Sequence, residues 1–310
     1  MLDMFHLPPS TVADVQMFMN VGNWSEWVKP KGKSMTMMYC IGSGAGGGGA
    51  HTAATTNARG GGGGGGAGGM ARLVIPTMFL PNVLMCYPGK GGMGGAAQTD
   101  GIAGELSYIS HGIGFSGVMG NLTAVPQVIL QSGAVAAALG AKGTAAVPGA
   151  AGAGSTIATA GTTVLGYSGL WSANVGPAGM IGGAVAGAVG TACALFLATP
   201  AFLPWSGGAG GAGSTNADYA GGTQTAIWPM NTMPGPPVAL PNGGGGASFL
   251  NPLMSLGGNG GAALTNGIGG NGGSGGYPAS GGGGGGAGVV AGGGSQGGAG
   301  AGGLIIIISW

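Results

Sequence analysis

The sequence predicts a mainly β protein with little α-helix, in which short strands form a small sandwich-like scaffold and glycine rows extend from it. Three observations lead to this fold class. The 310 residues include 81 glycines and only 4% charged residues. Unbroken glycine rows stand at 60–66 and 281–286. These rows recur beside short apolar segments that have the pattern of strands.

The glycine rows have two interpretations. An isolated row is a flexible linker, because glycine loses the most backbone entropy on ordering. Rows held side by side by their flanks can instead order as left-handed polyproline II-like helices, the polyglycine II form, whose N–H and C=O groups bond to adjacent rows. A row surrounded on all sides needs glycine at nearly every position, which fits the rows Gly60 to Gly66 and Gly281 to Gly286. We favour the ordered form.

Composition excludes several classes of protein. So few charged residues exclude an ordinary globular enzyme as a first expectation, and also charge-rich disorder. The net charge of +1 gives no electrostatic footprint for nucleic acid. Cys40, Cys86 and Cys193 form no CxxC pair, so we interpret them as buried small apolar residues and not as a disulfide framework or zinc site.

No catalytic, metal-binding or cofactor-binding constellation is expected, and the chain is predicted not to be an enzyme. His6, His51 and His111 have no partner at the spacing of a known metal motif. His111, near Asp100 and Glu105, is interpreted as a loop or hydrogen-bonding histidine. The many G-x-G-x-x-G matches carry no information in a chain this rich in glycine, and no P-loop lysine follows them.

Residues 1–23 are the least glycine-rich part and are predicted to be an N-terminal attachment segment. Pro8 and Pro9 favour an extended entry that docks on another subunit. Residues 11–19 fit a strand or a short helix, and the sequence does not decide between them. This segment lacks the basic region and apolar core of a secretory signal, so we expect assembly inside a cell.

Residues 24–142 are predicted to be a domain of strands and polyglycine. Trp24 and Trp27 stand near Lys29, Lys31 and Lys33. Stacking on the two tryptophans and the positive charge of the three lysines would suit binding of a ligand or of nucleic acid. We favour packing anchors with solvated lysines, because tryptophan pairs commonly anchor packing.

Several strands are expected from the residues themselves. Segments 34–41 and 125–131 have strand patterns, and the apolar run at 304–310 implies a strand buried on both faces. Pro76 and Pro81 cannot donate to a ladder, so strands around them should lie at edges or break there.

These features together resemble the glycine-rich domain of bacteriophage tail fibres and related tail proteins. That pattern is roughly F-x-x-x-G-x-W-x-x-P-x-G, then a strand and polyglycine, with 26–28 resembling an extra insertion here. Segment 71–87 and the turn at 87–92 are similar to the family's next strands, as is 105–109, and 304–310 resembles its closing strand. The residues that match the motif are Phe18, Gly22, Trp24 or Trp27, Lys29, Pro30 and Gly32.

The resemblance is poor in the middle of the chain. Residues 143–217 carry no charge and are predicted to be an apolar insertion. Segment 180–202 is long enough to span a bilayer, and Gly179, Gly183 and Gly187 have G-x-x-x-G spacing. Membrane contact is not favoured, because no Lys or Arg flanks the segment and glycine weakens a helix by about 1 kcal/mol per residue. A buried or subunit-interface insertion is the preferred interpretation.

Residues 218–310 are predicted to be a glycine- and proline-rich part that closes with the C-terminal strand. Trp228, Met230 and Met233 stand between prolines. They either form an exposed adaptable surface or seal the ends of glycine rows, and we favour the seal.

The resemblance implies a virion structural protein, and we favour a phage tail fibre or tail-tip component that displays recognition loops for host attachment on a rigid scaffold. Its expected location is the virion, assembled in the host cytoplasm. Expected partners are other tail or capsid proteins, a host surface receptor and further copies of the chain, a trimer being one option, because a charge-poor surface is poorly soluble alone. A capsid fibre or decoration protein and a secreted glycine-rich matrix or antifreeze-type protein are alternatives.

The candidate recognition residues are polar interruptions of the glycine-rich stretches. They are His51, Thr52, Thr55, Asn57, Gln98, Asp100, Asn216, Asp218, Tyr219 and Gln224. The expected scaffold residues are Trp24, Trp27, Pro30, Gly60, Gly66, Gly281, Gly286 and Trp310.

Overall fold

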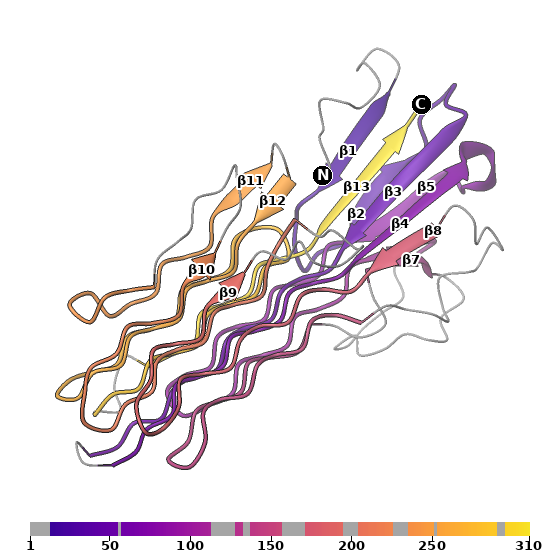
Figure 1. Ribbon diagram of the computed structural model, residues 1–310. Coiled ribbons are helices and arrows are strands. Elements are labelled where there is room, and N and C mark those ends of the chain that lie inside the picture. Colours follow the sequence, from indigo (N-terminus) through magenta and orange to yellow (C-terminus); the bar gives the residue numbers. More distant parts are fainter. Residues whose placement is uncertain are drawn as a thin grey trace.

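A computed structural model shows β-sheets at one end of the molecule and glycine-rich segments running side by side from them to loops at the other end (Figure 1). In the described residues the only helix is a short 3₁₀ turn, η2 (Thr77–Phe79). The prediction of a mainly β chain with little α-helix is therefore confirmed. The structure describes residues 13–54, 57–112, 128–132, 137–156, 171–194, 204–225, 235–250, 253–289 and 295–310.

The larger sheet has the strand order β1-β13-β3-β4-β8, and every neighbouring pair is antiparallel. The C-terminal strand therefore lies inside the sheet, between the first strand and the third. The strands are β1 (Asp14–Phe18), β13 (Leu304–Ser309), β3 (Met35–Ile41), β4 (Met70–Pro76) and β8 (Trp171–Asn174).

The second sheet has the order β2-β5-β6-β7 and is also antiparallel, with an irregularity between Ile109 and Ser110. Its strands are β2 (Ser25–Val28), β5 (Val83–Tyr87), β6 (Tyr108–Ser110) and β7 (Val128–Gln131). Two small ladders complete the set: β9 (Cys193–Ala194) with β10 (Gln224–Thr225), parallel, and β11 (Ser248–Leu250) with β12 (Leu253–Ser255), antiparallel.

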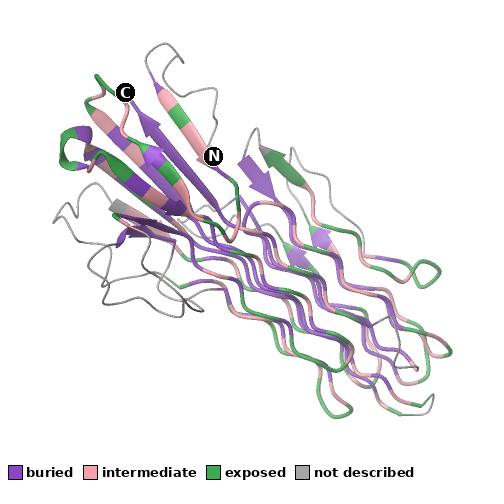
Figure 2. Ribbon diagram, turned by 180° about the vertical axis from the view of Figure 1, so that it is seen from behind, coloured by how far each residue is buried: buried purple, intermediate pink, exposed green. Residues whose placement is uncertain are grey.

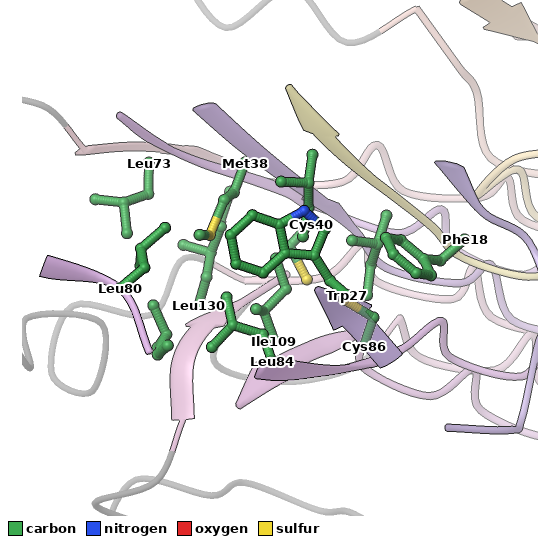
Figure 3. Packing of buried hydrophobic residues seen from close by; sticks show 14 of the residues in the cluster. Phe18, Trp27, Met38, Cys40, Leu73, Leu80, Leu84, Cys86, Ile109 and Leu130 are labelled. Atoms are coloured by element: carbon green, nitrogen blue, oxygen red, sulfur yellow. The ribbon is translucent and has the colours of Figure 1, made fainter. Parts of the chain in front are cut away.

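The two larger sheets share one apolar core. Trp27 of β2 is fully buried in it, facing Met38 and Cys40 of the larger sheet (Figure 3). Cys86 of β5 joins the same cluster. All three cysteines of the chain are buried and free, as the sequence predicted. Trp27 acts as a packing anchor, and segment 26–28, expected to be an insertion, is instead part of strand β2.

Strand β13 is buried on both faces, as its run of apolar residues predicted. Ile305 and Ile307 belong to the core between the two sheets. Ile306 and Ile308 belong to a second cluster on the opposite face, where Trp205 packs against the sheet. The C-terminal strand thus joins both apolar layers.

The remaining strand predictions are resolved as follows. Segment 11–19 contributes a strand, β1, since Asp14–Phe18 pairs with β13. Strands were expected either to lie at sheet edges around Pro76 and Pro81 or to break there, and the structure shows breaks. Strand β4 lies inside the sheet and ends at Pro76, while Pro81 stands between η2 and β5.

The glycine-rich segments, here called rods, bond to one another with a period of three residues. In the rod 60–69, successive N–H groups donate in turn to three neighbours, at 138–144, 177–183 and 279–285, with donor–acceptor distances of 2.8–3.2 Å. Each neighbour therefore receives every third bond.

The carbonyl groups of the same rod are satisfied in the same order. They accept bonds from 42–51, 149–155 and 208–211. In the series from 208–211, the next acceptor is Gly68 O, which receives its bond from the indole Nε1 of Trp205 at 2.7 Å and not from a backbone N–H. Rod 60–69 is thus bonded on every side to segments far apart in sequence.

Close packing explains why the inner rods consist of glycine. Every residue of 60–66 and of 281–286 is buried. A Cβ placed on Gly62 would lie 2.0 Å from the carbonyl oxygen of Gly48, far inside van der Waals contact. Inner glycines are therefore a steric requirement of the bundle.

Outer rods carry side chains at every third position, on the side that faces solvent. One such series is Val175, Ala178, Ile181 and Ala184, all exposed. The exposed residues lie along the outer rods and at the loops, while the inner rods are buried (Figure 2). Outer rods thus have a local three-residue period, whereas inner rods have none.

Residues of the uncharged segment 143–217 take part in the same bundle as the rods before and after it. Within 180–202, the described part, 180–194, is two extended stretches joined by the turn at 184–187, and it ends in β9. No helix among the described residues is long and apolar enough to cross a membrane. Residues 195–203 lie outside the described part, as do Trp228, Met230 and Met233.

We predict that Gly62→Ala lowers the free energy of unfolding by more than about 4 kcal/mol, because its new methyl group overlaps the backbone of a neighbouring rod. The matched control is Gly245→Ala, where the nearest atom lies 3.7 Å from the new Cβ. That change should leave stability unaltered or raise it by about 0.4–1 kcal/mol. Chemical denaturation measures both values, and equal stability of the two variants would contradict close packing of the inner rods.

Candidate functional site

The rods are joined by loops that meet at the end of the bundle opposite the sheets (Figure 1). Consecutive rods run in opposite directions, so each outgoing rod turns there and returns to the sheet end. Tight turns close several of these loops; for example, Thr99 N–H donates to Ala96 O at 3.0 Å and Asn57 N–H to Ala54 O at 3.0 Å. The loops, here called the tip loops, are the described residues of 52–58 (52–54 and 57–58) and residues 96–99, 144–147, 184–187, 215–218 and 264–267.

Most of the predicted recognition residues that are described lie in or beside the tip loops. Asn57, Gln98, Asp100, Asn216 and Asp218 are exposed there. Their positions come from different parts of the sequence, and the antiparallel rods bring them to one end.

Arg59 ties three tip loops together, and the sequence interpretation did not assign it this role. Its side chain is fully buried at the start of rod 60–69. Its guanidinium donates to Thr215 O at 3.3 Å and to Leu264 O at 3.4 Å. Burial lowers the pKa of Arg59, and the charge of Asp218 opposes that shift.

The backbone around Arg59 reinforces the same connection. Arg59 and Ser214 exchange both N–H···O bonds, at 3.0 and 2.9 Å. Asp218 accepts bonds from the N–H and the hydroxyl of Thr265, both at 2.7 Å. Loops 52–58, 215–218 and 264–267 therefore form one connected group, held by one cation and one carboxylate.

A second pair of loops is joined by Gln98. Its side-chain amide donates to the hydroxyl and the carbonyl oxygen of Thr52. Directly after the same loop, Asp100 Oδ1 accepts a bond at 2.8 Å from the N–H of Lys142, which lies beside loop 144–147. These bonds order the polar side chains that the sequence placed in separate segments.

Two predicted recognition residues are buried, so their expected display was wrong. Thr52 is covered by the bundle and accepts the bonds from Gln98. Gln224 is fully buried, and its amide donates to Gly207 O and Gly258 O at 3.1 and 3.0 Å. It lies on β10, well inside the bundle, where it satisfies rod carbonyls. Thr55 lies outside the described residues.

His51 and Tyr219 are half-buried beneath the tip loops. Burial lowers the pKa of His51, and the positive charge of Arg59 lowers it further. The Tyr219 ring packs on a cluster of buried alanines and against Gly187. Gly187 has a φ of 99°, and a Cβ there would lie 2.6 Å from the tyrosine ring, so this turn requires glycine.

The remaining titratable groups form no metal site in the part of the chain that the structure describes. Glu105, expected near His111, instead accepts bonds from Tyr87 Oη at 2.7 Å and Lys90 N–H at 3.0 Å. Burial raises the pKa of Tyr87 above its ordinary value, and the hydrogen bond to Glu105 adds to the effect.

Comparison with known proteins gives no family assignment. The chain matches no family model, and a search of curated proteins gives no match.

We predict that Arg59→Met loosens the tip loops without unfolding the bundle, because the carbonyls of Thr215 and Leu264 lose a charged donor. We expect the tip loops to lose about 1–3 kcal/mol of stability. Amide hydrogen exchange should accelerate in 215–218 and 264–267, while the far-ultraviolet circular dichroism spectrum stays unchanged. Lys142→Met, at an exposed cation in the neighbouring rod, is the control and should leave exchange in these loops unaltered. Unchanged exchange in Arg59→Met would show that Arg59 does not hold the loops.

Proposed function

We propose that this chain is a structural protein of a bacteriophage virion, a tail fibre or tail-tip component that displays recognition loops for host attachment. The observation that carries the proposal is the gathering of six tip loops, five of them with polar side chains, at one end of a bundle whose β-sheets lie at the other end (Figure 1). A rigid frame that presents variable loops at one extremity is a common arrangement for recognition.

The rods are, in this proposal, polyglycine II helices. A helix with three residues per turn points each successive N–H about 120° further round its axis. The bonding of 60–69 supports this geometry, since its successive N–H groups donate in turn to three neighbouring rods, and every third N–H donates to the same rod. Rod 281–289 supports it equally, donating in turn to 206–212, 45–48 and 267–273.

Such a bundle suits a particle exposed to the environment. The N–H and C=O groups of its inner rods are largely bonded within the bundle, and its three thiols are buried. The loops at its tip present amide and hydroxyl groups, among them Asn57, Gln98, Thr99 and Asn216. These groups would recognise a host receptor by hydrogen bonds and not by net charge.

The sheet end would attach the protein to the rest of the virion. The C-terminal strand lies there (Figure 1), and Val28, Val83 and Met78 are exposed on the second sheet and on η2. Exposed apolar residues of this kind mark interfaces with other proteins. Other tail proteins, or further copies of this chain, are the partners that this end suits.

Competition for adsorption tests the attachment role. Isolated protein in excess should reduce adsorption of the particle that carries it to host cells. Combining Asn57→Arg with Asn216→Arg places two bulky cations at the tip loops and should weaken competition by at least about tenfold, or about 1.4 kcal/mol. Ala178→Arg, on the exposed side of an outer rod, is the matched control.

The result expected is loss of competition in the loop variant and full competition in the side variant. Equal competition by all three proteins would contradict recognition through these loops. A wild-type protein that never competes, and is found on the capsid in electron micrographs, would assign the chain to the capsid fibre or decoration class.

A further inference from the structure

A surface at the end of the sheets remote from the rods exposes apolar side chains. Val28 of β2 and Val83 of β5 stand opposite each other and are 59% and 42% exposed, on the face turned away from the buried Trp27. Met78 and Phe79 of η2 are 77% and 50% exposed. These four residues, Val28, Met78, Phe79 and Val83, are here called the apolar patch.

Lysines stand beside the apolar patch. The turn 29–34 joins β2 to β3 and contains three of them. Both ends of this turn are bonded to the segment that carries η2. Lys29 N–H donates to Asn82 O at 2.9 Å, and Thr77 N–H donates to Ser34 O at 2.8 Å. The turn is therefore held alongside η2, and its lysines lie next to the patch.

The surface has an excess of positive charge. The lysines of the turn are Lys29, Lys31 and Lys33, and neither the turn nor the segment 77–83 contains an acidic residue. Lys31 is exposed. Glu26, which is exposed on β2, adds one negative charge at the border of the surface. The three lysines outnumber it.

The fold holds η2 in place without using the two large side chains that it exposes. Leu80 is buried in the core between the sheets, and the hydroxyl groups of the buried Thr77 and Thr36 are hydrogen-bonded at 2.8 Å. Met78 and Phe79 belong to neither core cluster of the larger sheet. An exposed apolar patch rimmed by polar residues marks a site of interaction with another molecule.

The charge of this surface narrows what can cover it. Two copies of the chain meeting patch to patch would bring their lysines together, and like charges across an interface oppose association. Nucleic acid would pair with the lysines but place phosphates against the apolar patch, and the buried Trp27 offers no ring to a base. A protein surface with carboxylates beside apolar side chains complements both halves.

We propose that this surface docks on a neighbouring protein of the same particle, through a segment that presents carboxylates beside apolar side chains. The proposal rests on the virion role proposed above and gives the chemistry of the partner at the sheet end. The apolar patch supplies most of the affinity, because docking removes its area from water. The exposed lysines add little affinity, and they set the rate of association and the choice of partner.

Rebinding to the particle tests the apolar patch. Particles assembled without this chain are mixed with purified protein, and co-sedimentation over a concentration series measures the bound fraction. Combining Met78→Ser with Phe79→Ser should raise the apparent Kd at least about tenfold. Val147→Ser, in a tip loop where the valine is 55% exposed, is the matched control and should bind as wild type does. Thermal unfolding checks that these variants are folded, as the exposure of all three side chains leads us to expect.

The salt dependence of rebinding tests the charge. Lys31 is the lysine to change, because Lys29 also holds the chain, its Nζ donating to Leu80 O at 2.7 Å. Wild-type binding should weaken as ionic strength rises, whereas Lys31→Glu should bind more weakly at low salt and lose most of this dependence. Lys142→Glu, at an exposed lysine near the tip loops, is the control and should keep the wild-type dependence.

The outcomes separate this proposal from the virion role. A wild type that binds the particle, with the Met78 and Phe79 double variant and Lys31→Glu binding equally well, would overturn the docking proposal and leave the virion role standing. A wild type that never binds the particle would overturn both. Flotation of the wild type with vesicles of phosphatidylglycerol and phosphatidylcholine, lost in the double variant, would assign the surface to a membrane and overturn docking on a protein.

Discussion

The whole molecule depends on hydrogen bonds between rods, because an extended glycine strand makes none within itself. Each N–H and C=O of such a rod must find its partner on another segment, and in rod 60–69 every C=O and the N–H groups of residues 60–68 do so. Glycine is required inside for the same reason: the backbone of one rod occupies the space where the Cβ of the next would lie. Folding of one rod therefore requires its neighbours to be in place, which makes the bundle cooperative.

The sheets set the register of this network. Ile41 of β3 pairs with Met70 of β4, and the next bond along the chain, Gly42 N–H to Gly69 O at 2.8 Å, already belongs to the rods. Serines satisfy backbone groups where the two-residue period of the sheet changes to the three-residue period of the bundle. Ser107 Oγ donates to Ile41 O at 2.6 Å and accepts from Gly89 N–H at 2.8 Å. The apolar core thus aligns strands, and the strands align rods.

Much of this architecture could be predicted from local sequence. The glycine rows, the apolar run of β13 and the burial of Trp27 follow from residue type and periodicity alone. The tip was predicted less well, since the display of Thr52 and Gln224 and the role of Arg59 depend on which rods become neighbours. That arrangement is a property of the folded bundle: a polar residue is exposed on an outer rod and buried on an inner one, with no difference in its local sequence.

Amide hydrogen exchange of the glycine row 60–66 tests the central claim most directly. Its N–H groups are buried and bonded to neighbouring rods, so they should exchange as slowly as those of strand β13, near the rate set by global unfolding. Exchange of these glycines at the rate of an unstructured chain, while β13 stays protected, would contradict the account and make the rows flexible linkers between strands.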